Sequence, residues 1–134
     1  MTHGVMIRRA TDLDITNIKA RFLSEPDKSI GFVTVGAEVL GETVFVIECG
    51  SEVAGFVTLR TLTDEVFPIF IFSPYRRKGI AAEAMKQLVE LWKAEGGQEI
   101  FLDIKDGAEK FWEYVFAGYP VRHVTDRKFS VDIS

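Results

Sequence analysis

A short segment in the second half of the chain places three adjacent cations between a run of apolar residues and a glycine. Within Phe70–Ala82, the cations Arg76, Arg77 and Lys78 directly precede Gly79. The apolar run predicts a strand, and the residues after the glycine predict an amphipathic helix. Free amides at a helix start, together with the helix dipole, attract anions such as phosphate. The segment therefore predicts an anion-binding turn that the glycine lets a ligand approach closely.

The same turn also has a simpler interpretation. Three cations beside a helix start can form a solvated turn, and the helix dipole disfavours cations there. The segment is not a Walker loop, because the Gly-x-x-x-x-Gly-Lys-Ser/Thr spacing is missing. The dinucleotide fingerprint needs three glycines after a parallel strand, whereas only Gly79 is present here, after strands that we expect to be antiparallel. The surrounding elements must decide between the two interpretations.

The hydrophobic pattern predicts the element order β-α-β-β-β-α-β-α-β-β, which is an α+β (mixed α/β) arrangement of helices on a sheet. The predicted strands cover residues 5–9, 43–47, 53–62, 66–72, 100–104, 119–125 and 128–133. The predicted helices cover residues 12–23, 79–95 and a segment that starts at Asp106 and ends at Gly118. Residues 27–42 are ambiguous and fit a loop with a short helix over 37–40. No linker divides the chain, so we expect a single domain over residues 1–134.

Three local signals refine this pattern. Thr11 and Asp14 have the spacing of a capping box at the start of the first helix. Gly50 and Ser51 suit a type II′ hairpin turn, because glycine tolerates positive φ at the first central position. Pro68 has no N–H to donate, so the strand that contains it must be interrupted, bulged or at an edge of the sheet.

Composition excludes several classes of protein. The 134 residues are 47% apolar and 27% charged, as in an ordinary globular domain, with a net charge of −4. This acidity argues against general nucleic-acid binding, and no apolar run approaches the ~20 residues that cross a membrane. One cysteine and two histidines cannot build a structural zinc cluster, so we expect no metal. The start of the chain shows no signal-peptide pattern, and we expect a cytoplasmic protein.

The pattern Arg76-x-x-Gly79-x-Ala81, between a strand and an amphipathic helix, resembles the Arg/Gln-x-x-Gly-x-Gly/Ala signature of the GNAT superfamily, the Gcn5-related N-acetyltransferases. The resemblance extends to the element order over almost the whole chain, as in a small single-domain member. It implies the GNAT fold, a mixed sheet flanked by helices and splayed between its fourth and fifth strands. It also implies that acetyl-CoA, the acyl donor, binds in the splay.

The resemblance also assigns the residues that bind the cofactor. The pyrophosphate of acetyl-CoA would lie on the backbone amides of Arg76, Arg77, Lys78, Gly79, Ile80 and Ala81. The pantetheine arm would pair, like an extra strand, with the backbone of Ile69, Phe70 and Ile71. A strand that splays from its neighbour has unpaired amides and carbonyls, which an extended amide-containing ligand can satisfy.

Acetyl transfer to an amine needs an oxyanion donor and a proton for the departing thiolate. By resemblance, a backbone N–H near Ile71 would serve the oxyanion. The family places a tyrosine four residues before the Gly-Phe/Tyr that ends its second motif helix, and Tyr114 stands at that distance from Gly118. Tyr114 would therefore be the proton donor. Two alternatives stay open: Tyr114 belongs to an aromatic core stripe, or Trp112 takes its place if the helix is shifted.

A general base is harder to assign. Asp103, in the sequence Leu-Asp-Ile-Lys, is similar to the acid of the Leu-Glu-Val-Arg motif of some protein N-terminal acetyltransferases in this superfamily, where it acts through water. The alternative is a strand-end carboxylate that pairs with Lys105 or solvent. Asp64 and Glu65 are further candidates, or members of a solvated turn. The position of a cofactor-binding Asn in the family is Gly107 here, so one polar contact is missing or is supplied by Asp106.

These observations predict an N-acetyltransferase that moves the acetyl group of acetyl-CoA to a primary amine of a small molecule or peptide by direct attack. The alternative is an inactive GNAT-like domain that binds CoA or another phosphate ligand as a sensor or interaction module. The expected partner is the amine acceptor, with no nucleic acid and no membrane. A homodimer is compatible with the sequence.

Overall fold

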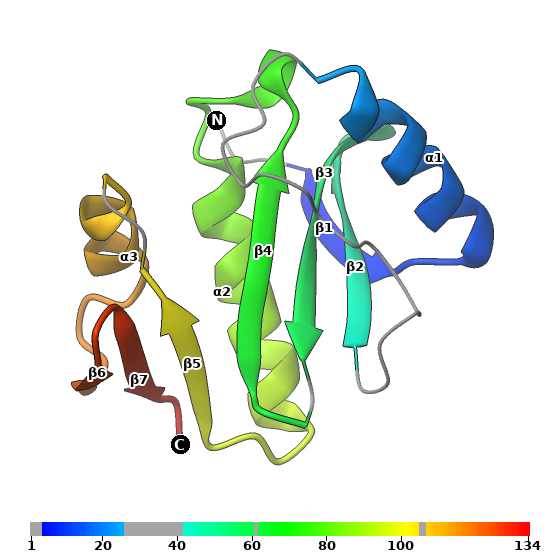
Figure 1. The fold of residues 1–134 in the computed structure, drawn as a ribbon. Helices are drawn as coiled ribbons and strands as arrows, with labels where there is room; N and C mark the ends of the chain where they lie inside the picture. The colour runs from blue at the N-terminus through cyan, green and yellow to red at the C-terminus, as the bar shows by residue number, and fades with distance from the viewer. Residues whose placement is uncertain (1–3, 26–41, 61, 105–106) are drawn as a thin grey trace.

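The computed structural model describes residues 4–25, 42–60, 62–104 and 107–134, which form one mixed sheet with helices on both faces (Figure 1). The seven strands are β1 (Val5–Arg9), β2 (Glu42–Cys49), β3 (Glu52–Arg60), β4 (Glu65–Ile71), β5 (Glu99–Asp103), β6 (Val121–Thr125) and β7 (Lys128–Asp132). Their order across the sheet is β1-β2-β3-β4-β5-β7-β6. The helices are α1 (Asp12–Leu23), the 3-10 helix η1 (Ser73–Tyr75), α2 (Ile80–Ala94) and α3 (Glu109–Val115).

The predicted fold class and element order are confirmed. The predicted loop and short helix within residues 27–42 lie outside the described residues, except that β2 already begins at Glu42. The third predicted strand was placed too long, because β3 ends at Arg60, whose carbonyl accepts a hydrogen bond from the amide of Thr63 in the following turn. None of the described helices is long and apolar enough to cross a membrane.

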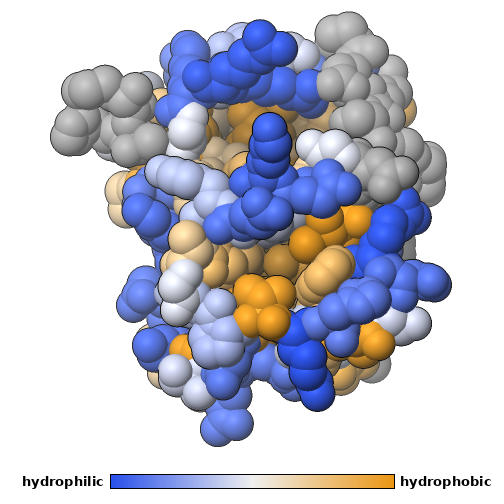
Figure 2. All heavy atoms as spheres, turned by 90° about the vertical axis from the view of Figure 1, so that its left-hand side faces the viewer, coloured by the Kyte–Doolittle hydropathy of each residue, from blue (hydrophilic) through white to orange (hydrophobic). Residues whose placement is uncertain are grey.

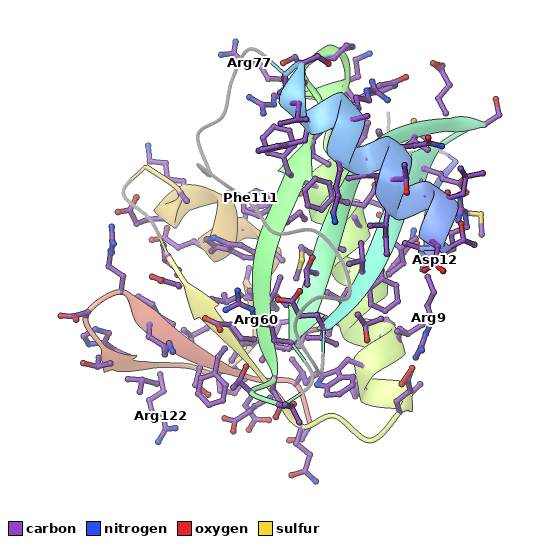
Figure 3. The ribbon with its side chains drawn as sticks, turned by 45° about the vertical axis from the view of Figure 1, so that its right-hand side comes forward. Arg9, Asp12, Arg60, Arg77, Phe111 and Arg122 are labelled. Atoms are coloured by element: carbon purple, nitrogen blue, oxygen red, sulfur yellow. The ribbon has the colours of Figure 1, made fainter. Side chains whose placement is uncertain are left out.

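α1 covers one face of the sheet, where it lies across the strands (Figure 3). It begins with the predicted capping box: the Thr11 hydroxyl accepts a hydrogen bond from the Asp14 amide, and the Asp14 carboxylate accepts one from the Thr11 amide. Its buried Ile18 and Phe22 pack on an aromatic cluster of the sheet. The members of that cluster on the strands and just after β4 are Val44, Val46, Phe56, Phe70 and Phe72. Phe70 therefore lies on the face of β4 that packs against α1.

α2 and α3 cover the opposite face. α2 buries Ile80, Ala84, Met85, Leu88 and Val89, which recur at helical spacing along one side of the helix. α3 was expected to start at Asp106 and end at Gly118, but it runs only from Glu109 to Val115. Ala108 is its N-cap residue and supplies no side-chain hydrogen bond, while the Glu109 carboxylate accepts one from the Gly107 amide. The helix therefore starts later than the capping pattern indicated.

The sheet opens between β4 and β5, as the family resemblance implied. These parallel strands pair only at Glu65 with Phe101 and at Val66 with Leu102. On the other side of β4, Val66 and Ile69 lie opposite Leu59 and Val57 of β3, so two residues of β4 face the single residue Thr58. This is a β-bulge at the position of Pro68. β4 is an interior strand, so of the three options for Pro68 the structure selects the bulge, and the splay begins there.

Candidate functional site

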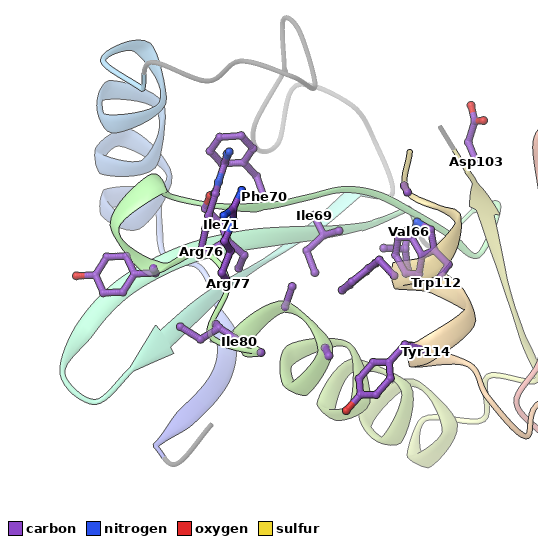
Figure 4. Close-up of a pocket in the computed structure, with 16 residues that line it drawn as sticks. Val66, Ile69, Phe70, Ile71, Arg76, Arg77, Ile80, Asp103, Trp112 and Tyr114 are labelled. Carbon is purple, nitrogen blue, oxygen red and sulfur yellow. The ribbon is translucent and has the colours of Figure 1, made fainter. Parts of the chain in front are cut away.

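A cavity of about 530 Å³ occupies the splay, between β4, the start of α2 and α3 (Figure 4). All the residues predicted to bind the cofactor line it except Lys78, and so do the predicted proton donor Tyr114 and the candidate base Asp103. Six further residues complete the lining: Val66, Tyr75, Ala82, Ala108, Phe111 and Trp112. Figure 2 looks at the side of the molecule that carries α3 and β6, and shows an apolar hollow beneath a hydrophilic rim. The tertiary structure thus brings the strand, the cationic turn and the aromatic helix to one site.

β4 presents backbone groups to this cavity. The carbonyl oxygen of Phe70 lies against Gly55 of β3, where a Cβ atom would collide with it. The carbonyl of Ile71 is instead reached from the turn by the Arg76 side chain. Because successive peptide groups of a strand point to opposite sides, Ile69 and Ile71 direct their N–H and C=O groups to the open edge. Of the three residues predicted to pair with pantetheine, these two have the required orientation.

The cationic turn ends in a left-handed glycine. Gly79 is the N-cap residue of α2 with φ 76° and ψ 8°, and no side chain caps the first amides of the helix. Arg77 also has positive φ, at 63°. The 15-residue helix therefore starts at the cavity with amides that have no intrahelical acceptor. This geometry suits an anion, while the exposed Lys78 side chain stands outside the cavity lining.

Arg76 folds back on the end of β4. Its Nε donates a hydrogen bond of 2.7 Å to the Ile71 carbonyl, and its guanidinium carbon lies 4.8 Å from the centre of the Phe70 ring. The Arg76 side chain therefore stabilises the last residues of β4, and its positive charge is a second property that could attract an anionic ligand.

A buried carboxylate holds the turn from the α1 side. Glu25, 5% exposed, accepts hydrogen bonds from the amide of Ser73 at 3.1 Å and from the Ser73 hydroxyl. Nearby, the Tyr75 hydroxyl donates to Glu52 at 2.7 Å, which raises the pKa of the phenol. No sequence pattern indicated these contacts, because the partners lie 48 and 23 residues apart and follow no motif.

Tyr114 and Trp112 occupy different environments on α3. Tyr114 lines the cavity but is 70% exposed, whereas Trp112 is 9% exposed. The Trp112 ring stacks on Phe116 with centroids 6.0 Å apart and meets Phe111 edge-to-face at 4.8 Å. Figure 4 shows Trp112 beside Val66 and Tyr114 on the α2 side of the helix. Trp112 is therefore part of the aromatic core, whereas the phenol of Tyr114 lies at the rim of the cavity.

The three candidate bases lie near the end of the splay. Asp103 lines the cavity, yet it is exposed and its carboxylate points away from Ile69 and Trp112 (Figure 4). Glu65 pairs with Arg60 at 3.4 Å. Burial, with the charge of Glu99, raises the pKa of Asp64. Neither Asp64 nor Glu65 belongs to the cavity lining, so Asp103 alone of the three reaches it.

In the described part of the chain, no group of three or more His, Cys, Asp or Glu side chains could hold a metal ion. His123, on β6, places its Nε2 2.6 Å from the Asp126 carbonyl.

Comparison with known proteins agrees with this geometry. The model of the acetyltransferase (GNAT) family matches residues 14–115. No curated protein sequence matches the chain. Among solved structures, a GNAT-family acetyltransferase of Staphylococcus aureus Mu50 aligns with a TM-score of 0.67 and 12% identity, over 97% of this chain and 99% of that one.

Two other solved structures add detail. The ribosomal-protein-S18-alanine N-acetyltransferase of Escherichia coli aligns with a TM-score of 0.64 and 20% identity, over 97% of this chain and 94% of that one. PaiA N-acetyltransferase of Thermoplasma acidophilum, in complex with coenzyme A, aligns with a TM-score of 0.64 and 16% identity, over 96% and 97% of the two chains. At these identities the likeness shows a shared fold.

Proposed function

Because the chain belongs to the GNAT acetyltransferase family and is an acetyl-CoA-dependent N-acyltransferase, we propose that it acetylates a primary amine of a small molecule or peptide by direct attack within a ternary complex. The amine nitrogen attacks the thioester carbonyl carbon, and the carbon–sulfur bond breaks. The cationic acceptor first gives up one proton to become a neutral amine. The nitrogen loses a second proton as the amide forms, and the departing thiolate of CoA gains one. No covalent intermediate on the protein is needed.

The observation that carries this proposal is the joining of two complementary features in one cavity. The start of α2 offers unbonded amides and a left-handed Gly79 to a phosphate. Beyond it, the open edge of β4 offers the backbone of Ile71 and Ile69 to an extended amide chain. Acetyl-CoA carries a pyrophosphate followed by a two-amide arm, which is the order in which the cavity presents these partners.

The same arrangement suggests how the reaction proceeds. A backbone N–H of the open β4 edge would stabilise the oxyanion, as backbone donors do in other acyl transfers. Tyr114 would protonate the thiolate from the rim of the cavity, and Asp103 would take the proton of the amine through water. The acceptor is a cation before it reacts, and a net charge of −4 favours its approach.

Calorimetric titration with acetyl-CoA is the first test. We expect saturable 1:1 binding, and much weaker binding of acetyl-pantetheine, which lacks the phosphates that the α2 start would hold. The double variant Arg76→Glu/Lys78→Glu should reduce acetyl-CoA affinity at least several-fold, because it places negative charge beside the pyrophosphate. Absence of binding by the unaltered protein would contradict the proposal.

Release of CoA thiol in the presence of a panel of small amines and short peptides tests the transfer step. Tyr114→Phe should bind acetyl-CoA normally and turn over at least tenfold more slowly, because only the hydroxyl group that would supply the proton is removed. Tight binding of acetyl-CoA with no thiol release from any amine would instead indicate a domain that binds CoA without transferring its acyl group.

A further inference from the structure

The cavity extends from the cationic turn to the point where β4 and β5 pair. The turn lines one end of it with Arg77 and Gly79. At the other end β4 and β5 come together through the pair Val66 and Leu102, which blocks further passage between the strands. Figure 4 shows Val66 and Trp112 side by side at this closed end, far from Arg77 and Ile80.

The closed end is apolar and firmly packed. Trp112 is 9% exposed and Val66 is 4% exposed, and both belong to the main hydrophobic core. Trp112 is held on two sides, by its stack on Phe116 and its edge-to-face contact with Phe111. A ring with these contacts cannot rotate away without breaking core packing.

A thioester bound as in the proposed function would deliver its acyl group to this end. With the pyrophosphate at Gly79 and the amide arm passing Ile71 and then Ile69, the chain runs antiparallel to β4 toward Val66. Because of the bulge, Ile69 and Val66 lie opposite residues that are two positions apart on β3, so they are roughly 7 Å apart along the strand. The acyl carbons beyond the thioester would therefore enter the space between Ile69 and Trp112.

We propose that Trp112 sets the length of acyl chain that the site accepts, and limits it to acetyl and similarly short groups. This inference rests on the proposed function, because it assumes that the thioester lies along β4. The indole forms the floor against which a longer chain would collide. Replacing it by a smaller side chain would extend the apolar cavity toward the core and admit more methylene groups.

The test is calorimetric titration with CoA, acetyl-CoA, butanoyl-CoA and hexanoyl-CoA, none of which requires knowledge of the acceptor. We expect the unaltered protein to bind acetyl-CoA at least tenfold more tightly than hexanoyl-CoA. In Trp112→Ala this order should reverse, with a gain of roughly fourfold for each additional methylene that the enlarged cavity buries. Affinity for CoA itself should stay within about threefold in the variant, because its phosphate and amide contacts are elsewhere.

Two further variants keep the result interpretable. Trp112→Leu creates a smaller cavity than Trp112→Ala and should shift the preference only as far as butanoyl-CoA. It replaces Trp112→Ala in the test if thermal unfolding shows that the alanine variant is unfolded. Trp92→Leu is the matched control, because Trp92 lies on α2 against Gly97, outside the cavity lining, and should leave the order of affinities unchanged.

The outcomes separate this inference from the proposed function. If the unaltered protein binds neither CoA nor acetyl-CoA, the proposed function fails. If it binds both, yet binds hexanoyl-CoA as tightly as acetyl-CoA, the role of Trp112 is overturned while the proposed function stands. A folded Trp112 variant that keeps the original order of affinities also overturns it.

Discussion

The Nε of Arg76 donates a 2.7 Å hydrogen bond to the carbonyl of Ile71, and this contact ties the cationic turn to the last residue of β4. The guanidinium also lies over the ring of Phe70, whose other contacts are with α1 and the aromatic cluster. Arg76 therefore couples the two halves of the proposed cofactor site, the anion-binding turn and the open strand edge. Its role includes geometry as well as charge.

Replacing Arg76 should weaken cofactor binding by more than the loss of one charge. In Arg76→Gln the Nε–H donor and the cation over Phe70 are lost, so the end of β4 is released. Arg77→Gln removes the same charge from the neighbouring residue without touching Ile71, and serves as the control. We expect acetyl-CoA affinity to fall about tenfold in the first variant and about threefold or less in the second, as measured by calorimetry. Equal losses of acetyl-CoA affinity in the two variants would show that Arg76 acts only through its charge.

Gly79→Ala should damage both stability and binding. A Cβ at φ 76° costs about 1 kcal/mol, and the methyl group would stand where the proposed phosphate approaches. Gly96→Ala offers the same backbone strain, at φ 94°, in a position with nothing within 4 Å of an added Cβ and outside the cavity. Both variants should melt at lower temperature, but only Gly79→Ala should lose acetyl-CoA affinity, by tenfold or more. Retained affinity in Gly79→Ala would contradict the anion-binding role of the turn.

Acid should weaken the start of α1. Hydrogen bonds from Arg8, and then from Thr11, hold the pKa of Asp14 well below its usual range. A carboxyl group whose pKa is lowered by folding stabilises the folded state at pH values above its unfolded-state pKa of about 3.9. This stabilisation is lost as the pH falls through the pKa of the folded state. Asp14→Asn should therefore cost about 0.5–1 kcal/mol at pH 7.

Urea unfolding at pH 7 and at pH 2.5 measures this difference between Asp14→Asn and the unaltered protein. We expect the difference to shrink at the lower pH. Asp12→Asn removes a charge from the same helical turn without the partnership of Arg8, and should cost less at pH 7. If Asp14→Asn lowered the free energy of unfolding by the same amount at both pH values, the charge of Asp14 would contribute nothing to stability.

Asp64 should show the opposite pH dependence. Its pKa is raised by burial and by the charge of Glu99, so the folded state favours the protonated form. Such a group stabilises the folded state at pH values below its unfolded-state pKa of about 3.9. This stabilisation is lost as the pH rises through the pKa of the folded state. Asp64→Asn removes the partly buried charge and keeps a residue that tolerates φ 56°. The variant should be more stable by a few tenths of a kcal/mol at pH 7, with no gain at pH 3, in thermal unfolding.

Local chemistry made much of the fold predictable. The capping box of Thr11 and Asp14 is a contact between near neighbours, and the missing N–H of Pro68 disrupts a strand whatever surrounds it. The glycine at the start of α2 likewise fixes its own turn. The sequence by itself therefore determined the order of elements, the first helix cap and the disruption of the strand at Pro68, because each depends on periodicity or on hydrogen bonds within a few residues.

Only the tertiary structure decided which groups meet across the splay. It placed β7 between β5 and β6, set Glu25 on Ser73, buried Trp112 and left Tyr114 at the rim. Both aromatic residues lie on α3, which turns Trp112 toward the core and leaves Tyr114 exposed. These outcomes depend on how α1, α2 and α3 pack on the sheet, and the packing energy of a side chain depends on distant neighbours that no local pattern specifies.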